Sequence, residues 1–350
     1  MSQRTLFITT FLIISLVIIG LSVHFLFFQQ VSLNHPSTYD RLTGYRLNAL
    51  IIRFRTFDSI IAGTSMGQNF KCTDFDRITG DFSYKLTASG VKIPQTCKII
   101  EFACKRHKIR SVLLDMHTLL LINAPQEESM RYYNDNSLWG DLIDGVSLWS
   151  LKDREKYYKR RFRSEKKDTL GWTRDDIYCW DDGTKCSRAA LAHDILKGTY
   201  IKDVRLDLDL KYISFNVQEN LLPLIKSHPE ITFYLFLPPF TPFAYFWKGD
   251  DMMLARKAVM DYLLPLPNVR LYDFQGCSEI CLEFDQYKDI THYSAKISEW
   301  ILEQIKDDNF RVTPQNRHIF EKRLSDMLKN FDMEKEIDAM KEYGREHPLK

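Results

Sequence analysis

IIAGTSMGQNF, residues 60–70, is an apolar run that stops at Gly63 and continues at once into Thr64, Ser65 and a second glycine. Small and branched apolar residues before a glycine-containing turn predict a buried strand that ends at Gly63. The Gly-x-Ser-x-Gly spacing is that of a nucleophile elbow, a sharp strand-to-helix turn that presents a serine hydroxyl. A serine that merely begins the next helix would produce the same letters. The rest of the chain has to decide between these two interpretations.

Short apolar runs alternate with amphipathic stretches on both sides of this turn. Runs rich in β-branched and aromatic residues predict strands at residues 58–63, 82–87, 111–116, 231–237 and 269–274. Apolar residues at three-to-four spacing, and the segments that follow strands, predict helices at residues 67–78, 91–108, 250–264 and 294–306. This order predicts an α/β protein with a parallel sheet and helices on both faces, in three layers.

The N-terminus has a different character. Residues 6–28 carry no acidic or strongly basic side chain and are long enough to cross a bilayer. A cleaved signal peptide would have a shorter apolar core and a cleavage site of small residues, and a helix buried in the core is the other alternative. Arg4 precedes the span and Arg41 is the next strongly basic residue, which predicts a cytoplasmic N-terminus. We therefore expect a signal anchor in the cell membrane at residues 1–30, a juxtamembrane segment at 31–54 and an extracytoplasmic domain at 55–308.

Two regions do not follow the alternation. Residues 124–205 are interpreted as an insertion, which contains a basic cluster at residues 154–167 and four of the six tryptophans: Trp139, Trp149, Trp172 and Trp180. These side chains could bind sugars and anionic groups, or could pack the insertion and form a solvated face. The tail, residues 309–350, is expected to be helical, with one apolar face formed by Leu324, Met327, Leu328 and Phe331.

Charge and cysteine content exclude some classes of protein. A net charge of +2 without a nucleic-acid motif argues against a nucleic-acid partner. Seven cysteines fit an oxidising compartment, where we expect a Cys179–Cys186 disulfide and a second candidate pair at Cys277 and Cys281. No Cys-x-x-Cys pair occurs and the histidines do not cluster, so we expect neither a metal nor a cofactor.

A candidate base lies near the other end of the domain. Asp289 precedes His292 by three residues, just before the helix predicted at 294–306. A serine nucleophile needs a base, and the base needs an orienting carboxylate. Ligands of parallel sheets bind at the carboxyl ends of the strands, where Ser65 and this loop can meet. We expect Ser65 to attack, His292 to transfer the proton and Asp289 to orient the imidazole; a turn-capping aspartate beside a surface histidine is the alternative.

Together these blocks resemble the SGNH (GDSL) hydrolase superfamily over residues 55–306. Gly63-Thr64-Ser65 is similar to the family's serine block after the first strand, and Asp289 to His292 to its closing block before the last helix. The resemblance implies a flavodoxin-like three-layer fold and an oxyanion hole that includes backbone N–H groups of Ser65 and Gly90. GTSMGQNF, the FLPP strand end at residues 236–239 and DITHYS are similar to membrane-anchored members associated with bacterial surface polysaccharides. The anchor followed by an SGNH-like domain is distantly similar in architecture to the DltD proteins of teichoic acid alanylation.

The chain also departs from the family pattern. Thr64 replaces the aspartate of Gly-Asp-Ser, and Asp115-Met116-His117 stands where a Gly-x-Asn-Asp block is expected. His117 is therefore a further candidate donor to the oxyanion. Losing one such donor can slow catalysis about a hundredfold to a thousandfold.

The resemblance implies an esterase or acyltransferase that acts on a cell-surface or exopolysaccharide glycan. A membrane-bound acyltransferase or a polysaccharide-export protein is the implied partner. An α/β-hydrolase is disfavoured, because the serine follows the first strand and the candidate acid lies three residues from the histidine. A protein of a different class also remains open, namely a catalytically weak or inactive SGNH domain that binds or organises glycan.

Overall fold

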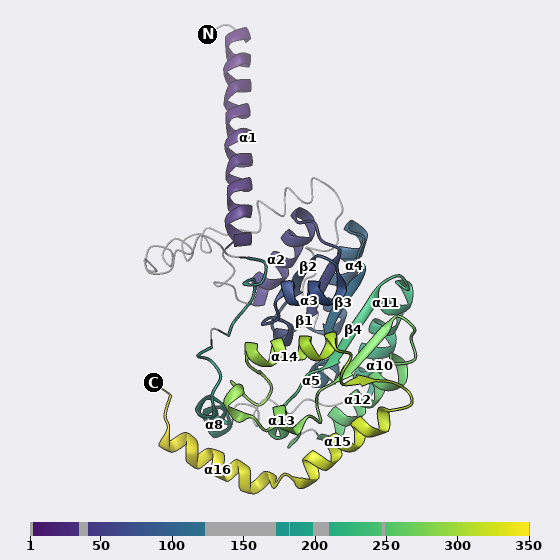
Figure 1. Cartoon of the computed structure of the whole chain (residues 1–350). Coiled ribbons are helices and arrows are strands. Elements are labelled where there is room, and N and C mark those ends of the chain that lie inside the picture. The colour runs from purple at the N-terminus through teal and green to yellow at the C-terminus, as the bar shows by residue number, and fades with distance from the viewer. Residues whose placement is uncertain are drawn as a thin grey trace.

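A six-stranded sheet lies at the centre of the fold, with the strand order β2-β1-β3-β4-β5-β6. The computed structural model describes residues 3–34, 41–122, 173–181, 183–198, 210–246 and 249–349 (Figure 1). The strands are β1 (Ser59–Gly63), β2 (Ser83–Thr87), β3 (Ser111–Asp115), β4 (Thr232–Leu237), β5 (Val269–Asp273) and β6 (Arg311–Val312). The first five strands pair in parallel. Each begins and ends within two residues of the bounds predicted from the sequence.

The sixth strand corrects the prediction of a purely parallel sheet. β6 pairs antiparallel with β5, so that Val312 lies opposite Leu271. Two residues with positive φ, Asp308 (55°) and Phe310 (57°), turn the chain back just before β6. A two-residue strand that follows such a turn has no apolar run that would predict it.

Each face of the sheet supports its own hydrophobic core. Along β1, Ile60 and Ala62 point into the first core and Ile61 into the second, the alternation expected of a strand buried on both faces. The first core includes residues of α2 (Arg41–Phe54), α4 (Ile93–Arg106), η4 (Phe215–Leu221), α11 (Leu222–Ser227) and α12 (Gly249–Tyr262). The second includes residues of α3 (Cys72–Thr79), α8 (Arg188–Lys197), α14 (Ala295–Lys306), α15 (Arg317–Asn330) and α16 (Met333–Glu346). The α/β class and the mostly parallel sheet are therefore confirmed.

Shorter elements connect these layers. They are η2 (Ser65–Gly67), α5 (Thr118–Leu121), α10 (Leu210–Ser214), η5 (Pro242–Tyr245), α13 (Ser278–Cys281) and η6 (Phe284–Gln286). η2, α5 and η5 follow the carboxyl ends of β1, β3 and β4, the edge of the sheet that carries the candidate site.

Residues 41–54 do not form a separate juxtamembrane segment, as predicted, but belong to the domain. They fold as α2, whose Leu47 and Ile51 are buried in the first core. Asn48 Nδ2 donates to the carbonyl oxygen of Thr87, 3.1 Å away, at the carboxyl end of β2. α2 joins the domain because one of its faces is apolar, and burying that face against the sheet is more favourable than exposing it to water.

The predicted insertion is also partly integrated. Trp139, Trp149, Trp172 and the basic cluster lie outside the described residues. α8, however, packs against α16, and a Cβ added at Gly344 would lie 3.1 Å from the carbonyl oxygen of Ala192. Both residues are buried, and Ala192 is part of the second core.

The two ends of the chain are helical. α1 (Gln3–Asn34) covers the predicted apolar span, and Leu6, Phe7 and Phe11 on it are exposed. Within the part of the chain that the structure describes, no helix combines the length and the apolarity needed to cross a membrane. α15 and α16 confirm the helical tail, with Leu324 and Met327 buried in the second core.

All seven cysteines are described and all are free thiols, so the predicted Cys179–Cys186 disulfide is wrong for this structure. Cys179 Sγ is used elsewhere: it donates to Asn69 Oδ1 at 3.6 Å and lies 3.5 Å from the carbonyl oxygen of Asp181. The second candidate pair is absent for a similar reason, because Cys281 Sγ donates to the carbonyl oxygen of Gln275, 3.4 Å away.

Candidate active site

The turn that follows β1 is built around a carboxylate from the neighbouring strand. Gly63 has φ +112°, and the Thr64 amide then donates to Asp115 Oδ2 at 2.7 Å. The Thr64 hydroxyl donates to the same oxygen at 3.0 Å and accepts from the Met66 amide at 3.1 Å. Thr64 therefore caps the short helix that begins with Ser65, in the role that serine and threonine commonly take.

Asp115 is fully enclosed beneath this turn. It is 1% exposed, and burial raises the pKa of its carboxyl group to about 7, although the hydrogen bonds from Thr64 and from the Gly67 amide oppose the shift. The sequence suggested that Asp115 stands in a block that lacks the expected asparagine. Its position shows a role that the sequence did not reveal, because it supports the turn that carries Ser65.

Ser65, His292 and Asp289 converge at the carboxyl edge of the sheet. Ser65 Oγ lies 2.7 Å from His292 Nε2, although 227 positions separate the two residues in sequence. His292 Nδ1 lies 2.7 Å from Asp289 Oδ2 and 2.9 Å from Asp289 Oδ1. The predicted convergence is confirmed, while the catalytic roles stay predictions.

Asp289 is held as a charged group. Its Oδ1 accepts the His292 amide at 2.8 Å and the Thr291 amide at 3.0 Å. Burial alone would raise the pKa of Asp289, but the neighbouring His292 and these hydrogen bonds outweigh burial and lower the pKa to about 2. A carboxylate at this position favours the imidazole tautomer with its proton on Nδ1. Nε2 is then free to accept the proton of Ser65.

The histidine loop is anchored at several points. A β-bridge pairs Tyr287 with Tyr293, and the Lys288 amide donates to the His292 carbonyl oxygen at 2.9 Å. Thr241, which follows β4, donates from its amide and its hydroxyl to the carbonyl oxygen of Ile290, at 3.1 and 2.9 Å. These contacts connect the loop to the end of β4, which limits its freedom to move away from Ser65.

The other two predicted oxyanion donors, Gly90 and His117, follow β2 and β3, the two strands that flank β1. Gly90, with φ +63°, follows Ser89, whose hydroxyl accepts from Gln68 Nε2 at 3.2 Å in the turn after Ser65. His117 is 8% exposed, and its Nδ1 has no hydrogen-bond partner among the described residues. Burial, followed by the charge of His292, lowers the pKa of His117 to about 3, so that its ring is neutral at physiological pH. A neutral imidazole has one N–H to donate. The role of Ser65, Gly90 and His117 as donors to the oxyanion stays a prediction.

Trp180 contributes to the site, although the sequence placed it only among the tryptophans of the insertion. Its Nε1–H donates to the carbonyl oxygen of Ser65 at 3.3 Å. Its ring lies edge-on to the His292 ring, with 5.8 Å between centroids and an interplanar angle of 83°. The ammonium of Lys288 lies 5.2 Å from the indole centroid. No local pattern distinguishes Trp180 from the other tryptophans of that region.

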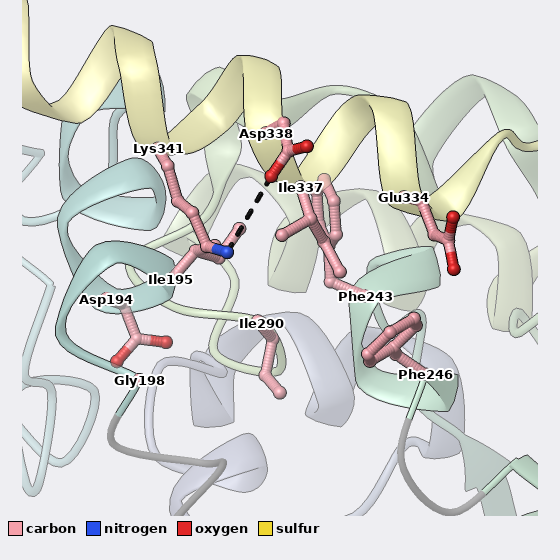
Figure 2. A pocket seen from close by; sticks show the side chains of 10 residues that line it. All are labelled: Asp194, Ile195, Gly198, Phe243, Phe246, Ile290, Glu334, Ile337, Asp338 and Lys341. Atoms are coloured by element: carbon pink, nitrogen blue, oxygen red, sulfur yellow. Dashed lines mark ion pairs between the residues drawn. The ribbon is translucent and has the colours of Figure 1, made fainter.

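A separate cavity of about 310 Å³ is lined by residues of α8, η5 and α16 and by Ile290 of the histidine loop (Figure 2). Ile290 lines it, but Ser65, Asp289 and His292 do not. Its other lining residues are Asp194, Ile195, Gly198, Phe243, Phe246, Glu334, Ile337, Asp338 and Lys341. It is therefore distinct from the place where Ser65 meets His292. Among the residues of the described ranges, no group of three or more His, Cys, Asp and Glu side chains could hold a metal ion.

No protein-family model matches this sequence, and no curated protein is significantly similar to it.

Proposed function

We propose that this protein is an SGNH-like, serine-dependent enzyme that hydrolyses or transfers acyl esters. The observation that carries the proposal is the 2.7 Å contact between Ser65 Oγ and His292 Nε2, with Asp289 on the other ring nitrogen. Such a chain of nucleophile, base and orienting carboxylate is the arrangement that acyl transfer requires. A serine with only a structural role would not require a neighbouring histidine whose ring is oriented by a buried carboxylate.

The proposed reaction has two halves. Ser65 Oγ attacks the ester carbonyl carbon while His292 Nε2 takes its proton, and the N–H groups of Ser65, Gly90 and His117 stabilise the oxyanion. The intermediate collapses when the alcohol leaves with the proton from His292, and an acyl-serine remains. Water or a sugar hydroxyl then attacks the acyl carbon while His292 takes its proton; the bond from that carbon to Ser65 Oγ breaks, and Oγ leaves with the proton from His292. Water makes the protein an esterase, and a sugar hydroxyl makes it an acyltransferase.

The strand order supports the SGNH-like assignment. The order β2-β1-β3-β4-β5 is that of flavodoxin-like sheets, which bind ligands where β1 and β3 diverge. Ser65 follows β1 and His117 follows β3, so both candidate groups lie at this switch point. The antiparallel β6 is an additional strand at the edge of the sheet. Three strands, β3, β4 and β5, separate it from β1, the strand that Ser65 follows.

The proposed substrate is an acylated cell-surface or exopolysaccharide glycan, handled outside the cell membrane. The apolar run of residues 6–28 in the sequence supports a membrane anchor. A membrane-bound acyltransferase or a polysaccharide-export protein is the proposed partner. Reporter fusions after residue 40 should be active only outside the cytoplasm. Recovery of a mature chain that begins near residue 30 would reject the anchor.

The central test is reaction with a fluorophosphonate, read as intact-protein mass, alongside hydrolysis of p-nitrophenyl acetate. One adduct should form, on Ser65, and Ser65→Ala should remove it. Ser278→Ala is the matched control, because Ser278 is exposed on α13 and should leave labelling unchanged. Labelling that is absent from the folded protein, or that falls on another serine, would reject the proposal.

The second candidate is a glycan-binding domain without catalysis. It is favoured by one observation, namely that Asp115 and His117 occupy the block where an asparagine donor is expected. This function predicts a folded protein that resists the phosphonate but is retained on immobilised glycan. Labelling of Ser65 would argue against it.

A further inference from the structure

Residues 173–181, called here the strap, cross the site between two parts of the chain that carry Ser65 and His292. At one end, Arg174 pairs with Asp76 and stacks on Phe82, with its guanidinium carbon 3.8 Å from the ring centroid. The next residue, Asp175, accepts from the Thr73 amide at 3.0 Å and from the Thr73 hydroxyl at 2.6 Å. Arg174 Nη1 also donates to the carbonyl oxygen of Ser83, at 2.9 Å. The strap is therefore attached to α3 and β2 before it reaches the site.

A buried lysine ties the strap to the turn that carries Ser65. Lys85, on β2, is fully buried, and its ammonium donates to the Gln68 carbonyl oxygen at 2.9 Å and to the Asp175 carbonyl oxygen at 2.6 Å. Burial lowers the pKa of Lys85. One side chain thus holds the backbone just after Ser65 and the backbone of the strap at the same time.

The other end of the strap reaches the helix that follows His292. Asn69 Oδ1 accepts the amides of Trp180 and Asp181, at 3.1 and 3.2 Å. Asp181 Oδ2 in turn accepts the amide of Ala295, the first residue of α14, at 2.8 Å. The strap therefore links the end of the Ser65 turn to the start of α14.

Trp180 lies between these two attachments and contacts both candidate groups. Its indole N–H holds the Ser65 carbonyl oxygen, which restricts the backbone that directs Oγ. Its ring meets the His292 ring edge-on, which restricts rotation of the imidazole. We infer that Trp180 is a positioning residue that holds Ser65 and His292 in their reacting geometry. The inference rests on the proposed function.

Two variants separate the two contacts of Trp180. Trp180→Phe keeps an aromatic edge near His292 but removes the N–H donor, whereas Trp180→Ala removes both. Fluorophosphonate labelling then gives a maximal rate, kinact, and a half-saturation concentration, KI. We expect kinact to fall about tenfold for Trp180→Phe and about a hundredfold for Trp180→Ala, because small displacements of reacting groups cost rate. KI should stay within about twofold, because a positioning residue does not bind the reagent.

Trp300→Phe is the matched control. Trp300 packs on Phe274 and Phe310, each with 5.5 Å between ring centroids, and should change neither constant. A Trp180→Phe variant that is folded and labelled at the wild-type rate would overturn the inference but not the proposed function. A rise in KI with kinact unchanged would overturn it in favour of a binding role. A wild-type protein that is not labelled would reject the proposed function, and the inference with it.

Discussion

Asp115 occupies the space that any side chain at Gly63 would need. A Cβ built at Gly63 would lie 2.5 Å from Asp115 Oδ2, the oxygen that accepts both hydrogen bonds from Thr64. Gly63 also has φ +112°, a conformation that favours glycine. The glycine and the aspartate are therefore fitted to one another, and together they set the shape of the turn that presents Ser65.

Gly63→Ala should lower the free energy of unfolding by at least about 2 kcal/mol. Backbone strain alone costs about 1–3 kcal/mol, and the collision with Asp115 adds to it. Gly80→Ala is the control, because Gly80 has φ +75° but no atom within 4 Å of an added Cβ. Urea denaturation of both variants separates strain from collision. Equal losses for the two would contradict the steric argument.

Asp115→Asn should change how stability depends on pH. The pKa of Asp115 is raised from 3.8 to about 7, so this carboxyl group stabilises the fold fully below pH 4 and loses that contribution as the pH rises towards 7. An isosteric amide does not ionise and still accepts from Thr64. The free energy of unfolding of the variant, relative to wild type, should therefore rise between pH 4 and pH 7, by a few kcal/mol at most. A constant difference across that range would show that Asp115 does not titrate there.

The three converging residues should act as a unit. Ser65→Ala should abolish hydrolysis of p-nitrophenyl acetate. His292→Ala should reduce the rate of hydrolysis nearly as much, since neither group works without the other. The double variant should be no slower than Ser65→Ala, whereas Asp289→Ala should cost less. His228→Ala is the control, because the ring of His228 pairs with the exposed Glu230. Multiplicative losses in the double variant would mean that the two residues act independently.

His117 should contribute as a neutral donor. His117→Phe removes the donor and should slow ester hydrolysis about a hundredfold to a thousandfold, the range seen when one oxyanion donor is removed. The pKa of His117 is about 3, so the loss should be the same at pH 5 and pH 8. His117→Gln, which keeps an N–H, should recover part of the rate. A His117→Phe variant with full activity would remove this residue from the oxyanion hole.

The buried pair of Arg256 and Asp273 should stabilise the fold only as a pair. Both side chains are about 2% exposed or less. Arg256→Met leaves the Asp273 carboxylate buried without its partner and should cost about 3–5 kcal/mol, and Arg256→Met with Asp273→Asn should recover much of that. Lys322→Met, which breaks an exposed pair with Asp326, should cost less than about 1 kcal/mol. Thermal and urea unfolding of these variants form the test.

The predictions from sequence succeeded where the signal was local. The five parallel strands follow from apolar runs, and α14 follows from its three-to-four apolar spacing. They failed for β6, which two positive-φ residues place against β5, and for α2, which the sequence separated from the domain. The disulfide prediction failed because spacing along the chain says nothing about where a thiol points.

The sequence by itself determined the alternation of strands and helices, and it pointed to Ser65, Asp289 and His292 as residue types that could work together. Local apolar patterns and short spacings suffice for that, because they depend on neighbours in the chain. Only the tertiary structure decided that Ser65 and His292 meet, that Asp115 supports the turn from below and that Trp180 contacts both. These contacts join residues as many as 227 positions apart, and the path of the chain through the sheet, not any local pattern, brings them together.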